Sequence, residues 1–364
     1  MRVVFAGGGT GGHLYPGLAI ARALVRRAPG VVPHFIGARR GIERDVLPGT
    51  EFAHTLLDLH PLYRSAPWRN WQTFTGGIAA WRAVGRLAAQ QAPAAIIGTG
   101  GYAAGVALAW GRAHAVPLAL HECDSFPGKV TRWFAPRAAL VSLGFPEAEA
   151  RLTVSPSTRV VAGGNPIAPP PADRATAAAR AHWQLPADAF VVLVVGGSQG
   201  SVALNEGVAA WVRAGLPDGV QLIWATGRAH HARYADLASA RVRIAPYLAP
   251  IADAYAAADL AITRAGAMTI AELCAWGIPS VLVPLPTAAQ DHQAHNARTL
   301  AAAGACVHLP QPELGAESLT RIVGALAHDR ARRDTMARAA LARGRPDAAD
   351  QLADVIATHL LRLS

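Results

Sequence analysis

The chain of 364 residues exceeds the size at which single hydrophobic cores stop growing, about 250–300 residues, so two domains are expected. Its composition, 52% apolar and 16% charged, excludes an intrinsically disordered chain. A formal net charge of +10 favours anionic partners, but the chain has no run of five basic residues and no Cys/His finger spacing, so nucleic acid is not expected among them.

Short β-branched runs alternate with longer Ala-, Leu- and Arg-rich segments of helical period, a pattern typical of parallel α/β domains. Strands in the first half are predicted near residues 3–6, 34–37, 95–98 and 118–121. Strands in the second half are predicted near residues 190–195, 221–225, 242–245, 260–263 and 280–283. Residues 162–166 (AGGNP) and the prolines at 169–171 cannot continue a helix or a central strand, so they predict an interdomain hinge.

Glycine-rich loops follow predicted strands in both halves, at residues 7–13 (GGGTGGH), 98–102 (GTGGY) and 196–200 (GGSQG). Glycine permits the close approach and positive φ of such a turn. Free N–H groups at the following helix start suit a phosphate. Each loop by itself could equally serve helix–strand packing, but three of them favour a ligand that carries a pyrophosphate.

The first loop also satisfies the dinucleotide fingerprint through Gly7, Gly9 and Gly12. The acidic residue that holds the ribose of NAD is missing, because the region after the second predicted strand reads GARR at residues 37–40. Arginines there could hold the extra phosphate of NADP, so an NADP-dependent oxidoreductase stays open as an alternative.

A predicted strand that ends at Thr263 runs into the segment 264–272 (RAGAMTIAE), which reads as a loop and a helix start. The backbone N–H groups of Ala267 to Thr269 could reach phosphate oxygens, and Glu272, about one turn further, could accept bonds from both ribose hydroxyls. The alternative is that Glu272 is only an acid favoured by the helix dipole.

Several separate segments, in order from residue 2 to about residue 350, together resemble the N-acetylglucosaminyltransferases of bacterial peptidoglycan synthesis, members of glycosyltransferase family 28. The segments are 8–13 with 16–17, 98–102, 121–122 with 127–128, 163–166, 196–200, 264–272 and 291–296. The resemblance implies an α/β GT-B fold, in which two Rossmann-like domains with parallel sheets are separated by a deep cleft. Residues 1–163 and a C-terminal helix at about 345–364 are then expected to bind acceptor and membrane, and residues 164–344 to bind the UDP-sugar.

The resemblance also implies an inverting transfer of N-acetylglucosamine from UDP-N-acetylglucosamine to the C4 hydroxyl of lipid I, undecaprenyl-pyrophosphoryl-MurNAc-pentapeptide, which forms lipid II on the cytoplasmic face of the membrane. In the family pattern, Leu248 contacts uracil through its backbone, Glu272 holds the ribose and Gln293, next to His292, reads the sugar hydroxyls. The other residues expected to bind substrate are Thr10, Gly11, Gly12, Gly100, Gly101, Tyr102, Asp124, Asn165, Ser198, Gln199, Arg264, Ala267, Met268, Thr269, Ile270 and Ala271.

Inversion requires the acceptor hydroxyl to lose a proton as it attacks, and a histidine can take that proton at neutral pH. His13, at the predicted helix start beyond the first loop, is the candidate base, although it could instead only pack or contact the donor. Glu122 is the second candidate catalytic residue. No Asp-x-Asp occurs, so we expect no cofactor and no protein-bound metal, with helix dipoles, N–H groups and Arg264 stabilising the departing diphosphate.

The chain departs from the family pattern at two places. Cys123 and Asp124 stand where the family commonly has glutamine and asparagine, and an ionised Asp124 can accept but not donate hydrogen bonds. Ala168 stands where an arginine is usual, which Arg174 could replace. A non-catalytic sugar-nucleotide-binding protein is therefore a further alternative.

Residues 68–86 resemble an interfacial amphipathic segment. Its apolar residues are Trp68, Trp71, Phe74, Ile78 and Trp81, and the neighbouring arginines are Arg64, Arg69, Arg82 and Arg86. Gly76 and Gly77 are expected to interrupt the helix, and such stripes are more often core, but a lipid acceptor favours a peripheral membrane contact. The sequence contains no signal-peptide pattern, no apolar run of 18 residues, and three widely spaced cysteines that indicate a reducing compartment.

Overall fold

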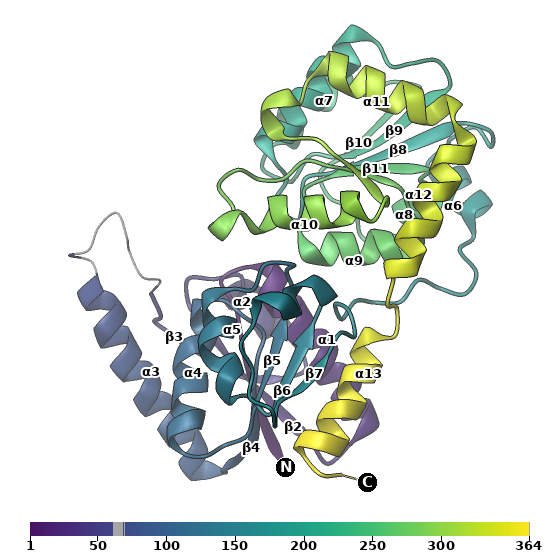
Figure 1. The fold of residues 1–364 in the computed structure, drawn as a ribbon. Coiled ribbons are helices and arrows are strands. Elements are labelled where there is room, and N and C mark those ends of the chain that lie inside the picture. The colour runs from purple at the N-terminus through teal and green to yellow at the C-terminus, as the bar shows by residue number, and fades with distance from the viewer. Residues whose placement is uncertain (61–67, 69, 364) are drawn as a thin grey trace. The chain divides into compact units, whose positions relative to one another are not determined.

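The computed structural model describes residues 1–60, 68 and 70–363, which form two compact units (Figure 1). Unit 1 comprises residues 1–167 together with 347–364, and unit 2 comprises residues 168–346. In the described part of the chain, no helix combines the length and apolarity that crossing a membrane requires.

Unit 1 is built on a parallel sheet of seven strands in the order β3-β2-β1-β4-β5-β6-β7. The strands are β1 (Arg2–Ala6), β2 (Val32–Ala38), β3 (Ala53–Leu57), β4 (Pro93–Gly98), β5 (Leu118–Glu122), β6 (Leu140–Leu143) and β7 (Arg159–Val161). The α-helices are α1 (Gly11–Arg27), α2 (Glu43–Val46), α3 (Asn70–Gln90), α4 (Tyr102–Ala113), α5 (Lys129–Phe134) and α13 (Ala348–Val355), which continues as a π-helical turn, η9 (Ile356–Leu360).

Helices cover both faces of this sheet. Val3 and Phe5 pack with α1 and α13 on one face, while Val4 and Ala6 pack with α4 on the other. Strands buried on both faces read as continuous apolar runs, which is why the sequence pattern located β1 and β4. The final helix belongs to unit 1 through its packing against α1, with ion pairs of 2.6 Å from Arg26 to Asp350 and from Arg27 to Asp354 at the rim.

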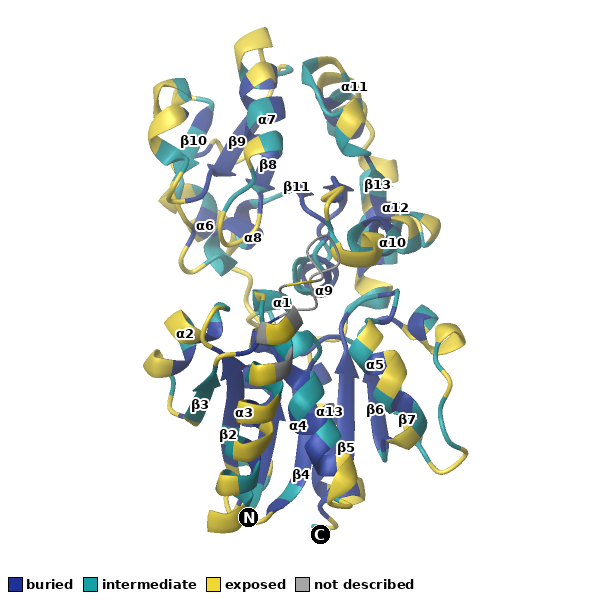
Figure 2. Ribbon diagram, turned by 90° about the vertical axis from the view of Figure 1, so that its left-hand side faces the viewer, coloured by how far each residue is buried: buried dark blue, intermediate teal, exposed yellow. Residues whose placement is uncertain are grey.

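Unit 2 repeats the plan with six parallel strands in the order β10-β9-β8-β11-β12-β13. The strands are β8 (Phe190–Val195), β9 (Val220–Ala225), β10 (Val242–Ala245), β11 (Leu260–Thr263), β12 (Ser280–Leu282) and β13 (Cys306–His308). The α-helices are α6 (Thr176–His182), α7 (Val202–Ala214), α8 (Ala252–Ala257), α9 (Ala267–Trp276), α10 (His292–Ala302), α11 (Ala316–His328) and α12 (Arg330–Arg343). Residues of α7 and α11 pack on one face and residues of α6, α8 and α9 on the other, and the strands between them are buried (Figure 2).

All nine strands predicted from the sequence are present, and the prediction missed β3, β6, β7 and β13. The expected interruption at Gly76 and Gly77 is wrong, since α3 runs unbroken from Asn70 to Gln90. A Cβ atom at Gly76 would lie 2.4 Å from the carbonyl oxygen of Asp58, so glycine here allows a close approach within an intact helix.

Candidate functional site

In unit 1, three loops leave the carboxyl ends of the neighbouring strands β1, β4 and β5 and meet at one edge of the sheet. The glycines of the first two loops are required by this contact. A Cβ atom at Gly101 would lie 2.1 Å from the carbonyl oxygen of Gly8, and both residues have positive φ, +75° and +155°. A Cβ atom at Gly9 would lie 3.0 Å from the ring of Tyr102, the first residue of α4. The predicted loop residues Thr10, Gly11 and Gly12 form the entry to α1 beside them.

His13 is the third residue of α1, and its backbone carbonyl accepts a 2.7 Å hydrogen bond from the Thr99 hydroxyl. Its ring lies against the second glycine loop, because a Cβ atom at Gly100 would come within 2.8 Å of Nδ1. The same Nδ1 atom lies 3.9 Å from the Cys123 sulfur. His13 is half-buried where the three loops meet.

The sequence prediction missed a buried carboxylate beneath the first loop. Oε1 of Glu43 accepts hydrogen bonds from the N–H groups of Gly9, at 2.8 Å, and Ala38, at 3.2 Å. Its side chain would collide with a Cβ atom at Gly8, Gly37 or Gly41. The Gly8 N–H is directed to the carbonyl oxygen of Gly100, at 3.4 Å. The N–H groups of Gly8 and Gly9, which were expected to face a phosphate, therefore hold the loop itself.

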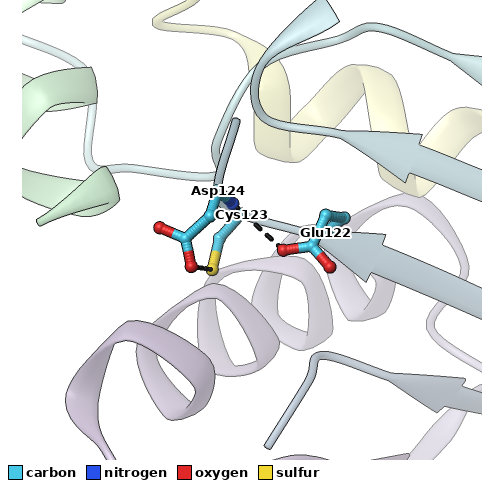
Figure 3. Close-up of side chains that lie close together, drawn as sticks. All are labelled: Glu122, Cys123 and Asp124. Atoms are coloured by element: carbon cyan, nitrogen blue, oxygen red, sulfur yellow. Dashed lines mark hydrogen bonds between the residues drawn. The ribbon is translucent and has the colours of Figure 1, made fainter. Parts of the chain in front are cut away.

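Glu122, the last residue of β5, is buried and shapes the third loop (Figure 3). Its two carboxyl oxygens accept from the N–H groups of Asp124, at 3.1 Å, and Gly128, at 2.9 Å. Burial, and then the negative charge of Asp124, raise the pKa of Glu122 from its ordinary 4.5 to about 7, although hydrogen bonds from Thr131 and the two amides oppose this. Both oxygens are engaged inside the loop, which favours a positioning role over the expected catalytic one.

A buried polar network ties the third loop to the segment that was expected to be the hinge. Nε2 of His121 donates to Oδ1 of Asn165 over 3.1 Å, because an amide oxygen can only accept. Nδ2 of Asn165 donates to the carbonyl oxygen of Cys123 over 3.0 Å, and Nδ1 of His121 faces the Ser142 hydroxyl at 3.2 Å. Burial lowers the pKa of His121 to about 4 and keeps the ring neutral. The expected substrate contact of Asn165 is therefore replaced by an internal bracing role.

Glu122, Cys123 and Asp124 bring three potential metal ligands within 4.8 Å of one another (Figure 3). The set is poorly suited to a cation, because both oxygens of Glu122 already accept from backbone amides. Burial and the adjacent carboxylates raise the pKa of the Cys123 thiol well above its ordinary value, so the thiolate that a metal requires is disfavoured.

In unit 2, the equivalent edge is the point where the strand order reverses between β8 and β11, the place where open α/β sheets bind ligands. The loop after β8 turns through Gly197 and Gly200, with φ of +95° and +78°, and leaves Ser198 and Gln199 exposed. After β11, Gly266 precedes α9, and no side chain caps the helix. The N–H groups of Ala267, Met268 and Thr269 thus form an uncapped positive helix end, with Ile270 and Ala271 in the same first turns.

Arg264 does not face this helix end as the sequence suggested. Its guanidinium is buried and makes five hydrogen bonds to protein acceptors. Nε and Nη2 donate to the Ser201 hydroxyl at 3.0 and 2.7 Å, Nη2 also to Gln311, and Nη1 to the carbonyls of Val283 and Pro284. Arg264 therefore joins the loops around the site, and the expected direct contact with the diphosphate is wrong for this arrangement.

Glu272 lies in the second turn of α9, half-buried, and Oε2 accepts a 2.8 Å hydrogen bond from the hydroxyl of Tyr255. Burial raises the pKa of Glu272, and the Tyr255 bond opposes that rise. Leu248, the residue expected at uracil, belongs to the same apolar cluster as Tyr255. The two residues predicted to hold the nucleoside are thus linked by a tyrosine that the sequence prediction did not include.

The start of α10 contains the residues expected at the sugar. Oε1 of Gln293 accepts from the N–H of Leu285 at 3.0 Å, which fixes its amide, and Nδ1 of His292 lies 2.8 Å from the carbonyl oxygen of Ala289. Gln290 and Asp291 precede them with φ of +58° and +56°. Such backbone is strained for residues other than glycine and concentrates at functional sites.

Arg174 cannot replace the family arginine missing at position 168. It donates to the carbonyl oxygens of Trp276 and Ala275 and lies 5.6 Å from the centre of the Trp276 ring. These contacts are at the carboxyl end of α9, about 14 Å along the helix from Ala267 at 1.5 Å per residue. The expectation that Arg174 takes the place of that arginine is therefore wrong.

Residues 3–142 match the glycosyltransferase family 28 N-terminal domain, and residues 191–352 match the glycosyltransferase family 28 C-terminal domain. The UDP-N-acetylglucosamine–N-acetylmuramyl-(pentapeptide) pyrophosphoryl-undecaprenol N-acetylglucosamine transferase of Moorella thermoacetica is 38% identical, with 98% of each chain covered. The protein of the same name from Salinibacter ruber is also 38% identical, over 98% of this chain and 96% of its own. The crystal structure of Acinetobacter baumannii MurG superposes with a TM-score of 0.76 at 27% identity, over 98% of both chains.

The chain belongs to glycosyltransferase family 28. The family membership and the two-unit α/β GT-B fold predicted from the sequence are confirmed. Both matching family models are glycosyltransferase domains, which supports a family 28 enzyme over an oxidoreductase.

Within this family 28 chain, the replacement of the usual amide by Asp124 predicts a measurable change in the titration of Glu122. Between pH 4.5 and about 7 the folded chain holds a proton on Glu122 that the unfolded chain has released, so the free energy of unfolding falls as pH rises. Asp124→Asn removes a charge that raises this pKa. We expect the free energy of unfolding of the variant, relative to that of the wild type, to rise by about 1 kcal/mol from pH 5 to pH 8, since one pKa unit corresponds to about 1.4 kcal/mol.

Urea denaturation at a series of pH values measures this difference. Asp188→Asn is the matched control, because it removes the same charge from an exposed position in unit 2. Parallel pH profiles for the wild type and Asp124→Asn would contradict the charge coupling.

Proposed function

We propose that this chain transfers N-acetylglucosamine from UDP-N-acetylglucosamine to the C4 hydroxyl of the N-acetylmuramyl residue of lipid I, which yields lipid II with inverted configuration at the sugar C1. The observation that carries this proposal is the uncapped start of α9, with Glu272 one turn further along the helix. Backbone N–H groups there suit a diphosphate, and a carboxylate at that distance suits the ribose. The names of the full-length relatives support the choice of donor and acceptor.

His13 acts as general base in this proposal. As the acceptor oxygen bonds to the sugar C1, the bond from C1 to the UDP oxygen breaks and the acceptor proton passes to the imidazole. The departing diphosphate carries the bonding electron pair and is stabilised by the N–H groups at the start of α9. Glu122 holds the loop beside His13 through the N–H groups of Asp124 and Gly128. No step requires a protein-bound metal.

The test combines turnover and binding on the purified chain. Wild-type protein given UDP-N-acetylglucosamine and lipid I is expected to form lipid II and release UDP. His13→Ala is expected to lower kcat by at least 100-fold, in the range of general-base catalysis, and to leave the Kd for UDP within twofold.

Near-normal turnover by His13→Ala would exclude the general-base role. UDP binding without transfer by the wild type would support the alternative of a sugar-nucleotide-binding protein. Stabilisation against heat by NADPH rather than by UDP would favour the oxidoreductase.

We further propose that the amino-terminal half of α3 and the preceding Trp68 form a peripheral contact with the cytoplasmic face of the membrane. The exposed fractions of Trp68, Trp71, Ile78 and Trp81 are 75%, 63%, 54% and 38%, which counts against the alternative that this stripe is core. Arg82 and Arg86 are also exposed and would favour anionic lipid. The predicted contributions of Arg64, Arg69 and the Phe74 side chain lie outside the described residues.

Changing Trp71 and Ile78 together to serine is expected to lower partitioning onto vesicles that contain anionic lipid by at least tenfold. Burial of large apolar side chains contributes about 1.5–3 kcal/mol each. Co-sedimentation measures the partitioning, and the Kd for UDP should stay unchanged.

Val202→Ser is the matched control, because it removes an exposed apolar side chain, 47% exposed, from unit 2. Equal vesicle binding by all three proteins would refute the membrane contact.

A further inference from the structure

Tyr255 is a buried residue of α8 whose hydroxyl reaches the carboxylate predicted to hold the ribose. It is 3% exposed, and its hydroxyl donates to Oε2 of Glu272 over 2.8 Å. Burial and the neighbouring carboxylate raise the pKa of Tyr255 well above its ordinary value, so the hydroxyl stays protonated and acts as a donor.

The ring of Tyr255 has little freedom to move. It packs in the apolar cluster that contains Leu248, Leu273 and Ile278, and its centre lies 5.8 Å from the ring of Trp276. The Trp276 ring is in turn covered by the guanidinium of Arg174. A hydroxyl on a ring held in this way fixes the direction of the carboxylate that it binds, since two ordered groups lose less freedom when they pair.

The bond leaves Glu272 able to bind a ligand. A carboxylate offers about four lone-pair positions, and Tyr255 occupies one of them on Oε2. Among the residues that the structure describes, Oε1 of Glu272 has no hydrogen-bond partner, so the positions that remain are enough for two hydroxyl donors. The tyrosine bond also favours the ionised carboxylate against the effect of burial.

We propose that Tyr255 is a positioning residue that directs Glu272 toward the 2′- and 3′-hydroxyls, and so sets the preference of unit 2 for ribonucleoside over deoxyribonucleoside diphosphates. This inference rests on the proposed function, because it requires UDP to bind at α9. Tyr255 itself does not touch the nucleotide. Its contribution passes through the orientation and charge of Glu272.

The test compares the affinities of UDP and 2′,3′-dideoxy-UDP for the full chain by calorimetry. Wild-type protein is expected to prefer UDP, and Glu272→Gln to lose most of that preference. Tyr255→Phe keeps the ring and its packing but removes the donor. We expect this variant to bind UDP about tenfold more weakly, which corresponds to 1.4 kcal/mol, and to keep the wild-type affinity for 2′,3′-dideoxy-UDP.

Tyr234→Phe is the matched control in the same unit. Tyr234 is 1% exposed, and its hydroxyl donates to the carboxylate of Glu206 over 3.1 Å in the apolar cluster on the other face of the sheet. Removal of this hydroxyl should change neither affinity. The deoxy-nucleotide is a second internal control, because a general loosening of the fold would weaken both ligands.

The outcomes separate the inference from the proposed function. If Tyr255→Phe lowers the affinities for both nucleotides equally, or lowers neither, the positioning role is overturned while UDP binding stands. If Glu272→Gln keeps the full preference for UDP, the role of the carboxylate falls and that of Tyr255 falls with it. If the wild type does not bind UDP, the proposed function itself is refuted.

Discussion

In each sheet, the first strand of the unit lies between its second and fourth strands, so β1 is flanked by β2 and β4, and β8 by β9 and β11. The connections on the two sides of this first strand therefore cross opposite faces of the sheet, and the loops that begin them diverge at the carboxyl edge. The loops that carry His13 in unit 1 and the start of α9 in unit 2 both begin there. His13 and the start of α9 depend on this constraint, because it leaves backbone N–H groups and short side chains exposed at the carboxyl edge of each sheet.

Holding these loops open requires buried polar groups, and the chain uses several of its charged residues for that purpose. Glu43 binds the first glycine loop of unit 1, and Glu122 binds the third. Arg264 gathers the loops around α9 through Ser201, Gln311 and two backbone carbonyls. Both carboxyl oxygens of Glu122 and the guanidinium of Arg264 have protein partners, which offsets the cost of removing these groups from water, whereas Oε2 of Glu43 is buried without a partner among the described residues. In this chain, Glu43, Glu122 and Arg264 thus brace the loops beside them.

The sequence could predict the strands that are buried on both faces, because β1 and β8 are uninterrupted apolar runs. It missed β3, β7 and β13, which lie at sheet edges, are three to five residues long and include polar residues such as His54, Arg159 and His308. It also missed the buried interior strand β6, whose four residues are interrupted by Ser142. Motif spacing placed Glu272 and the start of α9 on one helix. The sequence could not show that the side chain of Asn165 is used inside the fold while that of His13 lies where the loops meet. The role of Asn165 depends on hydrogen bonds to residues 42 to 44 positions away in the chain. Glu43 gives no signal either, because its neighbours Arg44 and Asp45 make the segment read as an exposed turn.

The departures at Cys123 and Asp124 bear on whether the site is intact. The contacts that shape this loop use main-chain atoms at both positions. Asn165 donates to the Cys123 carbonyl oxygen, and the Asp124 N–H donates to Glu122. Any residue supplies those atoms, so these two contacts do not depend on the side chains at positions 123 and 124. What changes is the chemistry of the two side chains, above all a carboxylate whose charge raises the pKa of Glu122. The two side chains therefore act on the electrostatics beside His13, while the backbone contacts of this loop are independent of them.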